Sequence, residues 1–563
     1  MTEPQAPPVP DIRPDELSFL ALGGVGEIGM NMSLYGFAGQ WLMIDCGITF
    51  ADGTMPGIDV LMADPAFIEE RRDRLAGLVA THAHEDHIGA IPYLWPRLKC
   101  PVYATPFTAA VLRLKLAEAG LENEVPIIEV PLSGKFTVGP FELELLTLTH
   151  SIPEPNAVIV RTKLGAVLHT GDWKFDPEPT LGLPYDMAAL ERLGASGVLA
   201  MICDSTNAMR PGNSGSESAV RDALVDLVGR CENRVAIACF ASNVARLQSA
   251  AAAAAAHDRH AALVGRSLWR IDRAARETGY LADVPPFLTE EEAAYLPRDK
   301  VLLLCTGSQG EPRSALARIA DDEHAHIVLE PGDTVIFSSR VIPGNERAIG
   351  RLQNALVLGG VEIVTEHDHF VHVSGHPAQD ELTEMYRAVK PAIAVPVHGE
   401  ARHLLAQARL AEACGVRQTI VTRNGEVIRL APAPAGVVGQ VPTGRLAADG
   451  NALLDTAGET LKNRQRMTFN GAALATVVLD RAGNIAVPPK VTIQGLAGED
   501  EAAQDLSDAV AEAVGRLQPR ERREDAAVHE AARVAVRRFI RARHGKRPVT
   551  EVHVVRLGRG EGP

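Results

Sequence analysis

The sequence has few cysteines and no long apolar run, and these two absences limit the class of protein. Its seven cysteines are scattered, odd in number and never in a CxxC arrangement. This favours reduced thiols in the core of a cytoplasmic protein over a disulfide framework. No segment approaches the ~20 consecutive apolar residues that a transmembrane helix needs, and the first residues lack the basic and apolar regions of a signal peptide. We therefore expect a soluble protein that is not secreted and has no membrane partner.

The sequence also lacks an excess of positive charge. The formal net charge is −15 at pH 7, which argues against a protein whose whole surface is adapted to nucleic acid. The exception is the stretch 516–547, which contains 11 Lys or Arg residues and 4 Asp or Glu residues. Such a patch can hold phosphates, although the solvated face of a helix has a similar composition. Its role stays open at the level of sequence.

A dense cluster of metal-ligand residues lies in the segment THAHEDHIGA, residues 81–90. Its core, HxHxDH, contains His82, His84, Asp86 and His87. Imidazole and carboxylate suit Zn²⁺, so one short loop of this kind can contribute to two ions. A polar loop of solvated histidines is the alternative, but four ligand-type residues so close together are far more specific than a lone motif.

The neighbouring segments support the metal interpretation. The apolar run LAGLVA before the cluster is typical of a buried strand, and IGAIPYLWPRL after it has helical spacing. The ligands would then lie at the carboxyl end of a strand, where α/β proteins place their chemistry.

A two-metal site needs further ligands from other segments. Three strand-like apolar runs end in a ligand-type residue: His150 after FELELLTLT, Asp172 in AVLHTGD and His398 in AIAVPVHGE. Asp45 in WLMIDCG follows the same pattern and is a candidate to orient a histidine. Taken singly, each residue is more often a cap or a turn residue. Together they repeat one pattern, a strand followed by a ligand.

The series IDCG, HxHxDH, TH, TGDWKF and PVHGE resembles the metallo-β-lactamase superfamily. The stretches CDSTNA, FASN, TGSQGEP, HVSGH and PVHGE narrow the resemblance to the β-CASP nucleases, and within them to the ribonuclease J family. It runs from about Leu17 to the C-terminus. The fold it implies is α/β: a metallo-β-lactamase αββα sandwich with an inserted doubly wound β-CASP domain and a small C-terminal α+β domain.

The resemblance also implies a role for each site residue. The ligands of one zinc ion would be His82, His84 and His150, and those of the second Asp86, His87 and His398. Asp172 would bridge the two ions. Asp204 and His376 would lie beside them, with His376 as the proton donor to the leaving oxygen. The family's substrate-contacting HxSGH motif corresponds to His372, Val373, Ser374, Gly375 and His376. Mn²⁺ or Mg²⁺ are further candidate activators.

Residues 212–366 interrupt this pattern with alternating helices and strands. Ser216 can cap a helix, and the apolar face of that helix would be Val220, Leu224, Leu227 and Val228. The segments RVAIACF, VLLLCTG, DTVIFSS and VEIVTE are typical of buried strands in a parallel sheet. Because His398 follows this region, we interpret it as the inserted domain, which divides the metallo-β-lactamase domain into residues 15–211 and 367–430.

Two loops of the insertion are candidate substrate contacts. TGSQGEP follows a strand and exposes Ser308 and Gln309, so its backbone amides could cradle phosphate oxygens; an ordinary turn is the alternative. Ser242 and Asn243, after RVAIACF, could face the same cleft.

The ends of the chain are interpreted from composition. Residues 1–14 carry five prolines and are expected to form a disordered leader. Prolines and glycines mark residues 431–452 as a linker. Residues 453–563 would form the separate α+β domain. It would contain strand-like MTFNGAALATVVLD and NIAVPPKVTIQG, a helix with Val528, Ala532, Ala535 and Phe539 on one face, and a last strand VHVVRL.

A glycine pattern near the N-terminus suggests a different fold. Gly24, Gly26 and Gly29 spell GxGxxG, with Asp45 about where a ribose-binding acid would be expected. A dinucleotide-binding fold requires a helix after the glycines. The next residues instead alternate like a β-hairpin with Gly36 and Gly39 at the turn, which favours a glycine-rich turn between strands.

We therefore expect a zinc-dependent ribonuclease with two zinc ions per subunit, acting in rRNA processing and RNA decay. It would be a 5′-to-3′ exonuclease that prefers 5′-monophosphorylated single-stranded RNA, has endonuclease activity and leaves 5′-phosphate products. The chain is expected to form a homodimer or homotetramer, within an RNA-decay complex. One alternative is a metallohydrolase of a small ester or lactam, which would not need the insertion. The other is a non-catalytic RNA-binding subunit, which could lose ligands, whereas this chain keeps them all.

Overall fold

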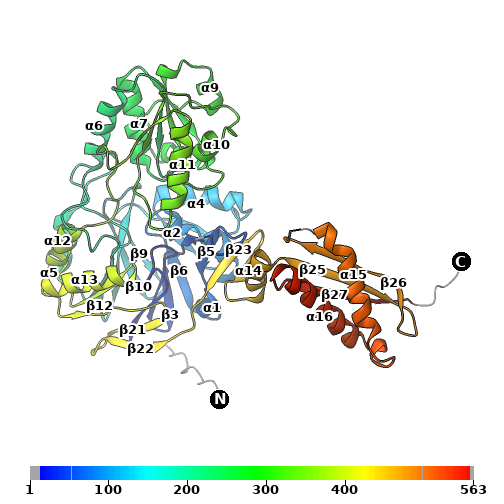
Figure 1. The fold of residues 1–563 in the computed structure, drawn as a ribbon. Helices are drawn as coiled ribbons and strands as arrows, with labels where there is room; N and C mark the ends of the chain where they lie inside the picture. Colours follow the sequence, from blue (N-terminus) through cyan, green and yellow to red (C-terminus); the bar gives the residue numbers. More distant parts are fainter. Residues whose placement is uncertain (1–12, 52, 498, 558–563) are drawn as a thin grey trace. The chain divides into compact units, whose positions relative to one another are not determined.

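The computed structural model describes residues 13–51, 53–497 and 499–557 (Figure 1). Residues 1–12 of the expected leader lie outside this range. The chain divides into two compact units, residues 1–49 with 62–444 and residues 50–61 with 445–563. In the described part of the chain, no helix is both long enough and apolar enough to cross a membrane.

Two sheets packed face to face form the core of the first unit. The eight-stranded sheet has the order β22-β21-β1-β2-β3-β6-β7-β8. Its strands are β1 (Leu17–Gly23), β2 (Met32–Phe37), β3 (Gln40–Ile44), β6 (Leu75–Val79), β7 (Val102–Ala104), β8 (Ile127–Glu129), β21 (Glu426–Ala431) and β22 (Gly436–Gln440). The seven-stranded sheet has the order β20-β19-β13-β12-β11-β10-β9. Its strands are β9 (Lys135–Val138), β10 (Phe141–Thr147), β11 (Asn156–Thr162), β12 (Gly165–His169), β13 (Ala200–Asp204), β19 (Ile393–Val397) and β20 (Gln418–Thr419).

Helices cover the outer faces of both sheets. Apolar residues of the two inner faces, such as Phe19, Phe141 and Val395, share one core. The seven-stranded sheet packs against the helices α5 (Met187–Ala195), α12 (Gln379–Val389) and α13 (Ala401–Ala413). On the other sheet lie α1 (Ala66–Glu69), α3 (Ile91–Leu98) and α4 (Pro106–Glu118), with Trp41 edge-on to Phe67. This is the predicted αββα sandwich.

Between the two parts of the sandwich the chain forms the predicted inserted domain. Its parallel sheet has the order β15-β16-β14-β17-β18. The strands are β14 (Val235–Ala238), β15 (His260–Val264), β16 (Val301–Cys305), β17 (Thr334–Phe337) and β18 (Glu362–Val364). The helices are α6 (Glu217–Val228), α7 (Val244–Ala256), α8 (Arg266–Glu277), α9 (Glu290–Ala294), α10 (Ala315–Ala320) and α11 (Glu346–Leu358). Ser216 caps α6 as predicted, because its hydroxyl accepts from the Ser218 amide.

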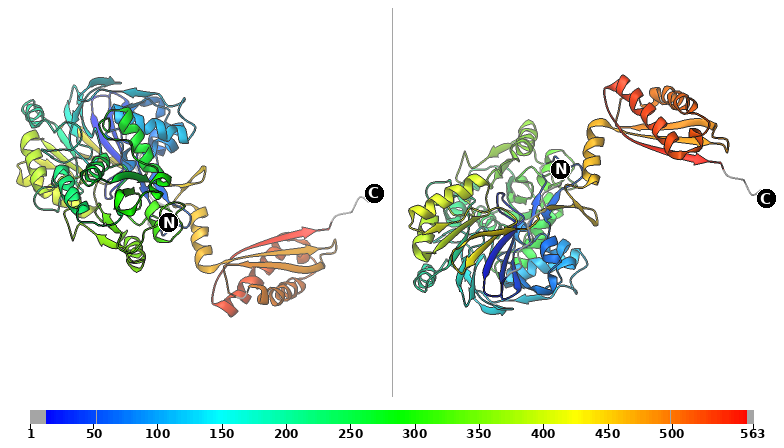
Figure 2. Two further views of the ribbon diagram at one scale, coloured as in Figure 1. Left: turned by 90° about the horizontal axis from the view of Figure 1, so that it is seen from above. Right: turned by 90° about the horizontal axis from the view of Figure 1, so that it is seen from below.

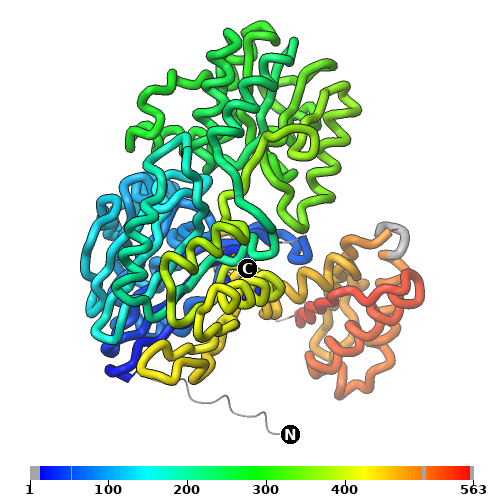
Figure 3. The backbone as a smooth tube through the Cα atoms, turned by 90° about the vertical axis from the view of Figure 1, so that its left-hand side faces the viewer, coloured from blue at the N-terminus to red at the C-terminus, as the bar shows by residue number. Residues whose placement is uncertain are grey.

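The two segments that join the insertion to the sandwich run side by side (Figure 3). The amide of Gln379 donates to the carbonyl of Arg210 at 2.9 Å, and the amide of Asp380 donates to the carbonyl of Gly212 at 3.1 Å. Both segments carry predicted site residues, so this pairing brings Asp204 and His376 to the same side of the sandwich.

The N-terminal glycines form a turn between strands. β1 pairs antiparallel with β2, which pairs antiparallel with β3, so the dinucleotide-binding alternative is wrong. The hairpin turn is at Ala38 and Gly39, where both residues have positive φ. Gly36 was also expected at this turn, but it pairs with Trp41 inside the ladder.

The second unit contains a three-stranded sheet in the order β26-β25-β27. Both long helices lie on one face of this sheet (Figure 2). The elements are α14 (Glu459–Asn470), β25 (Ala472–Leu479), β26 (Ile485–Gln494), α15 (Glu499–Gly515), α16 (Asp525–His544) and β27 (Val549–Arg556). A further sheet, β24-β23-β5-β4, consists of β4 (Ile48–Phe50), β5 (Val60–Ala63), β23 (Arg445–Asp449) and β24 (Ala452–Asp455).

Three sequence expectations for residues 431–563 differ from the structure. Residues 431–452 are not a plain linker, because they form β22 and β23, and two of their glycines, Gly436 and Gly439, lie within β22. Residues 467–470 end helix α14 and do not begin a strand, and Gly471, with φ 70°, terminates the helix. The buried face of α16 is Val528, Ala532, Val536 and Ile540; a four-residue spacing drifts around the helix, which leaves Ala535 and Phe539 only partly buried.

Candidate metal centre

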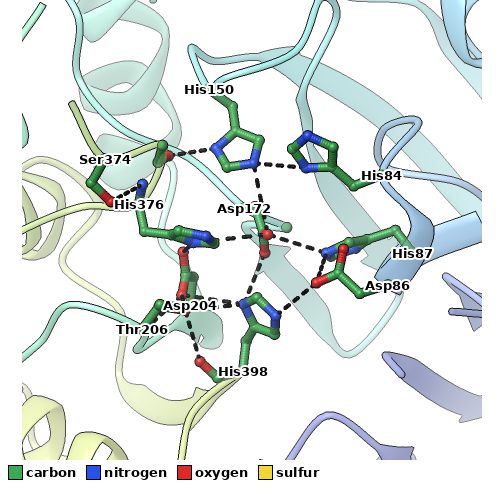
Figure 4. Close-up of polar contacts among 12 residues, drawn as sticks. His84, Asp86, His87, His150, Asp172, Asp204, Thr206, Ser374, His376 and His398 are labelled. Carbon is green, nitrogen blue, oxygen red and sulfur yellow. Dashed lines mark hydrogen bonds and ion pairs between the residues drawn. The ribbon is translucent and has the colours of Figure 1, made fainter. Parts of the chain in front are cut away.

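The predicted ligands converge at the carboxyl ends of neighbouring strands (Figure 4). β12, β13 and β19 are adjacent and parallel, so the residues that follow them, Asp172 and His398, meet at one edge with Asp204, the last residue of β13. His150 follows β10, whose carboxyl end lies at the same edge because β11 runs antiparallel between β10 and β12. The HxHxDH segment joins β6 of the other sheet to the short helix α2 (Glu85–Ile88).

Three histidines form the first ligand group. The Nδ1 atom of His84 lies 3.0 Å from Nε2 of His82 and 3.1 Å from Nε2 of His150. Both of these Nε2 atoms are within 4.0 Å of the Asp172 Oδ2 atom. The three imidazole nitrogens and one carboxylate oxygen therefore point at one small space.

The second group lies on the other side of Asp172. The Oδ2 atom of Asp86 is 3.6 Å from Nε2 of His87 and 3.2 Å from Nε2 of His398. Asp172 approaches the same residues, with Oδ2 at 3.2 Å from Nε2 of His87 and Oδ1 at 3.1 Å from Nδ1 of His398. The Asp172 carboxylate is thus shared by both groups.

Asp45 holds the HxHxDH loop from behind. Its carboxylate accepts from the amide of Thr81 at 2.8 Å and from the Thr81 hydroxyl at 2.9 Å, and it lies 2.6 Å from Nδ1 of His87. A carboxylate at Nδ1 leaves Nε2 of His87 as the nitrogen that faces the second group.

Two backbone features let the ligands approach this closely. His398 has φ 51°, and its amide donates to the carbonyl of Gly24 at 2.7 Å, so the glycine turn after β1 fixes the His398 backbone. A Cβ at Gly47 would lie 1.7 Å from the carbonyl oxygen of Asp86. Only glycine leaves room there for the start of α2.

The charge states of the site follow from burial and from the carboxylates. Burial, with neighbouring imidazoles, lowers the pKa of His82 and His150 well below the usual value, and it lowers the pKa of His84 to about 4. Burial also lowers the pKa of His87 and His398, but Asp172 and the other nearby carboxylates outweigh this effect and raise it overall. The first group is therefore held neutral, which is the form of histidine that binds a metal.

His376 and Asp204 form a pair beside the ligand groups. The Nδ1 atom of His376 lies 2.8 Å from Oδ2 of Asp204 and 3.8 Å from Oδ2 of Asp172. Burial lowers the pKa of His376, but these two carboxylates outweigh it, so the net pKa is raised. With Nδ1 bonded to Asp204, Nε2 is the nitrogen that remains to donate a proton.

The HxSGH segment is fixed against the ligands. The carbonyl of Gly375 accepts from Nδ1 of His150. The Ser374 hydroxyl accepts from Nδ2 of Asn207 at 2.8 Å and from the amide of His376 at 3.2 Å. Val373 is buried, and Nδ1 of His372 is buried without a hydrogen-bond partner.

The four residues of the insertion that were predicted to contact substrate differ in burial and in hydrogen bonding. Ser308 and Gln309 were expected to be exposed, but both are buried, and the Ser308 hydroxyl has no partner. Gln309 donates to the carbonyl of Arg340 and accepts from the amide of Ile342, so it braces a neighbouring loop. Asn243 caps α7 and is buried. Ser242, one residue before it, is half-buried.

Several contributing residues were not singled out from the sequence. Thr81 hydrogen-bonds Asp45 at the start of the HxHxDH segment. The hydroxyl of Thr206 donates to Asp204 at 2.7 Å, and Asn207 links Ser374 to Arg340. Thr206 and Asn207 lie in the CDSTNA stretch, so this motif could have indicated them from the sequence. Asn31, whose Nδ2 donates to the Asp86 carbonyl at 3.0 Å, has no such signal.

This donor set fits divalent metal ions. His82, His84, His150 and Asp172 form one group, and Asp86, His87, Asp172 and His398 form another; within each group the ligand atoms lie within 4.8 Å of one another. Imidazole nitrogens with carboxylate oxygens suit zinc and related ions.

Replacing Asp45 with Asn is expected to weaken metal binding about 10- to 100-fold, because His87 loses the acceptor that orients its ring. Competition with a chromophoric chelator measures this affinity. Asp299→Asn, at an exposed position, is the matched control and should bind metal like the parent chain. Unchanged affinity in Asp45→Asn would show that Asp45 does not position His87.

Family models cover most of the chain. The Metallo-beta-lactamase superfamily matches residues 26–229, and Ribonuclease J, beta-CASP domain matches 232–356. The Zn-dependent metallo-hydrolase RNA specificity domain matches 360–421, and the Ribonuclease J C-terminal domain matches 459–557.

Similar proteins agree with these matches. Ribonuclease J of Sinorhizobium meliloti is 47% identical over 552 residues, covering 96% of this chain and 98% of that protein. Ribonuclease J of Mycolicibacterium smegmatis is 38% identical, covering 99% of this chain and 100% of that protein. A crystal structure of a protein of unknown function from Enterococcus faecalis V583 shares the fold, with a TM-score of 0.52 at 16% identity over 74% of this chain and 100% of that one. The chain therefore belongs to the ribonuclease J family, whose members are metal-binding nucleases that hydrolyse RNA.

Proposed function

We propose that this chain is a two-zinc ribonuclease that degrades RNA from a 5′-monophosphorylated end, leaves 5′-phosphate products and also cuts internally, in RNA processing and decay. The observation that carries the proposal is the meeting, in one site, of two ligand groups that share Asp172 and a histidine-carboxylate pair beside them.

His82, His84 and His150 would hold one ion, Asp86, His87 and His398 the second, with Asp172 between them. Bound there, the two ions would supply an activated water and a counter-charge for the phosphoryl oxygens. Asp45 and Asn31 would keep α2 and His87 in place during turnover.

His376 would donate a proton to the departing 3′ oxygen. Asp204 supports this role, because its carboxylate both orients the ring through Nδ1 and favours the protonated form. Thr206 donates to the same carboxylate at 2.7 Å and fixes it. A positioned general acid typically contributes ~10² to 10⁴-fold in rate.

Buried polar atoms of the HxSGH segment and of Ser308 would hold the 5′-phosphate. His372 Nδ1 and Ser308 Oγ are buried and have no hydrogen-bond partner, which suits a site that a ligand completes. The pKa of His372 is lowered to about 3, mainly by burial. Smaller contributions come from the positive charges of Arg246, Lys174, Arg340 and Arg210. Arg246 and Lys174 are ion-paired with Glu217 at 2.8 Å and Asp176 at 3.0 Å. Arg340 and Arg210 would therefore supply the counter-charge for a phosphate dianion. Ser374 would add a hydroxyl donor.

The chain also divides into domains. We propose a metallo-β-lactamase domain of residues 15–211 and 367–430, a β-CASP domain of 212–366 and a C-terminal domain of 453–563. The family matches at 26–229, 232–356, 360–421 and 459–557 support these limits to within a few tens of residues.

His376→Ala is expected to lower kcat about 10²- to 10⁴-fold with little change in metal content, because it removes a proton donor and no predicted ligand. Single-turnover cleavage of end-labelled RNA measures the rate, and elemental analysis measures the metal. His326→Ala, at an exposed histidine of the insertion, is the control. A loss of less than about 3-fold in His376→Ala would contradict the assigned role.

The polarity of the reaction is tested with one RNA that carries either a 5′-monophosphate or a 5′-triphosphate, with and without chelator. Rapid, metal-dependent release of mononucleotides from the monophosphate form, absent in His82→Ala, is expected. Internal fragments from both forms alike would mean that endonuclease cleavage dominates. Lack of cleavage with any of Zn²⁺, Mn²⁺ and Mg²⁺ would favour a non-catalytic RNA-binding subunit.

A further inference from the structure

The last third of the second unit contains a stretch with many basic residues and no acidic ones. Residues 531–547 include seven Lys or Arg residues and no Asp or Glu. This run covers most of α16 and the turn that follows it, within a chain whose net charge is −15. A local cationic surface on an acidic protein concentrates the attraction for anions at one place.

Burial divides α16 into two faces. Val528, Ala532, Val536 and Ile540 are buried against the three-stranded sheet. Arg537, Arg538 and Arg541 are exposed on the other side of the helix.

These three guanidinium groups differ from Arg533 in their bonds, although Arg537 acts electrostatically on Glu530. In the described part of the chain, none of them makes a hydrogen bond or an ion pair through its side chain. Arg533, by contrast, is paired with Glu530 at 2.7 Å. The C-terminal half of the outer face therefore presents unpaired donors to solvent.

An exposed aromatic ring lies beside the end of this face. Phe469, at the end of α14, is 71% exposed. The Lys546 ammonium donates to the Phe469 carbonyl at 2.7 Å, and the Arg547 amide donates to Asn470 Oδ1 at 3.1 Å. These contacts fix the turn after α16 against the end of α14, so Lys546 and Arg547 lie close to Phe469 along the backbone.

We propose that the outer face of α16, with Phe469 and the turn at 546–547, is a binding surface for single-stranded RNA outside the active site. Unpaired arginines match the phosphate backbone, and an exposed aromatic ring can stack on an unpaired base. A second copy of this acidic chain is the other occupant that charge allows, and the oligomeric state of the variants distinguishes it from RNA. This proposal rests on the RNA-hydrolysing function and deepens it, because the surface would hold RNA beyond the nucleotides at the metal centre.

The test compares a triple variant, Arg537→Gln/Arg538→Gln/Arg541→Gln, with the parent in the full-length chain. Both carry His376→Ala for the binding experiment, so that RNA cleavage is slowed about 10²- to 10⁴-fold during the measurement. Fluorescence anisotropy with a 40-nucleotide unstructured RNA should show roughly 10-fold weaker binding. The slope of log affinity against log salt should fall by about 2, since each phosphate contact to a single strand contributes about 0.7. Phe469→Ala should weaken binding roughly 5-fold with little change in the slope.

Three controls separate the explanations. Arg230→Gln/Arg409→Gln/Arg417→Gln removes the same charge from exposed positions of the first unit and should keep parental affinity. Arg537→Lys/Arg538→Lys/Arg541→Lys should retain most of it. With His376 restored, the α16 triple variant should cleave a 6-nucleotide RNA at the parental rate, so failure of the hydrolytic function and failure of this surface give different results.

Parental affinity and salt slope in the triple variant would overturn the proposal. An equal loss in the first-unit control would reduce it to a general charge effect and also overturn it. A change in oligomeric state by light scattering, with RNA affinity per chain unchanged, would identify the face as an interface between copies.

Discussion

The site depends on one buried carboxylate. Asp172 lies at 3.1 to 4.0 Å from nitrogens of five histidines: His82, His87, His150, His376 and His398. Burial alone would raise the pKa of Asp172, but the imidazoles of His398, His87 and His376 lower it well below the usual value. An anion enclosed by so many nitrogens needs positive charge nearby, and either protons or divalent ions can supply it. The spacing of the ligands on both sides of Asp172 follows from this requirement.

The backbone makes the enclosure possible because ligands lie at strand ends. β12, β13 and β19 are parallel neighbours, so Asp172, Asp204 and His398 come together although almost two hundred residues of chain separate the last two. The β-CASP insertion occupies that interval, and it returns the chain with HxSGH placed against His150. Its own strands end in the loops of Ser242 and Ser308. The candidate site residues thus follow strands of three sheets, two in the sandwich and one in the insertion.

Much of this arrangement could be predicted from the sequence. The candidate ligands could be picked out because HxHxDH is a dense motif and because several apolar strands end in His or Asp. The inserted domain could be predicted because a candidate ligand, His398, follows it. Asp45 could be assigned to a supporting role on the same pattern. The contacts of Asn31, Asn207 and Gly24 could not, since they depend on how loops from distant segments fold against one another. Gln309 and Asn243 were expected at the substrate, but local bonds engage both side chains. In α16 the apolar spacing indicated a helix, whereas the exact buried face depended on how the helix crosses the sheet.

Crystals grown with Zn²⁺ and measured at the zinc absorption edge would test the central claim most directly. The account predicts two anomalous peaks per chain, one among His82, His84 and His150 and one among Asp86, His87 and His398, with the Asp172 carboxylate touching both. A single peak, or peaks that Asp172 does not contact, would contradict it.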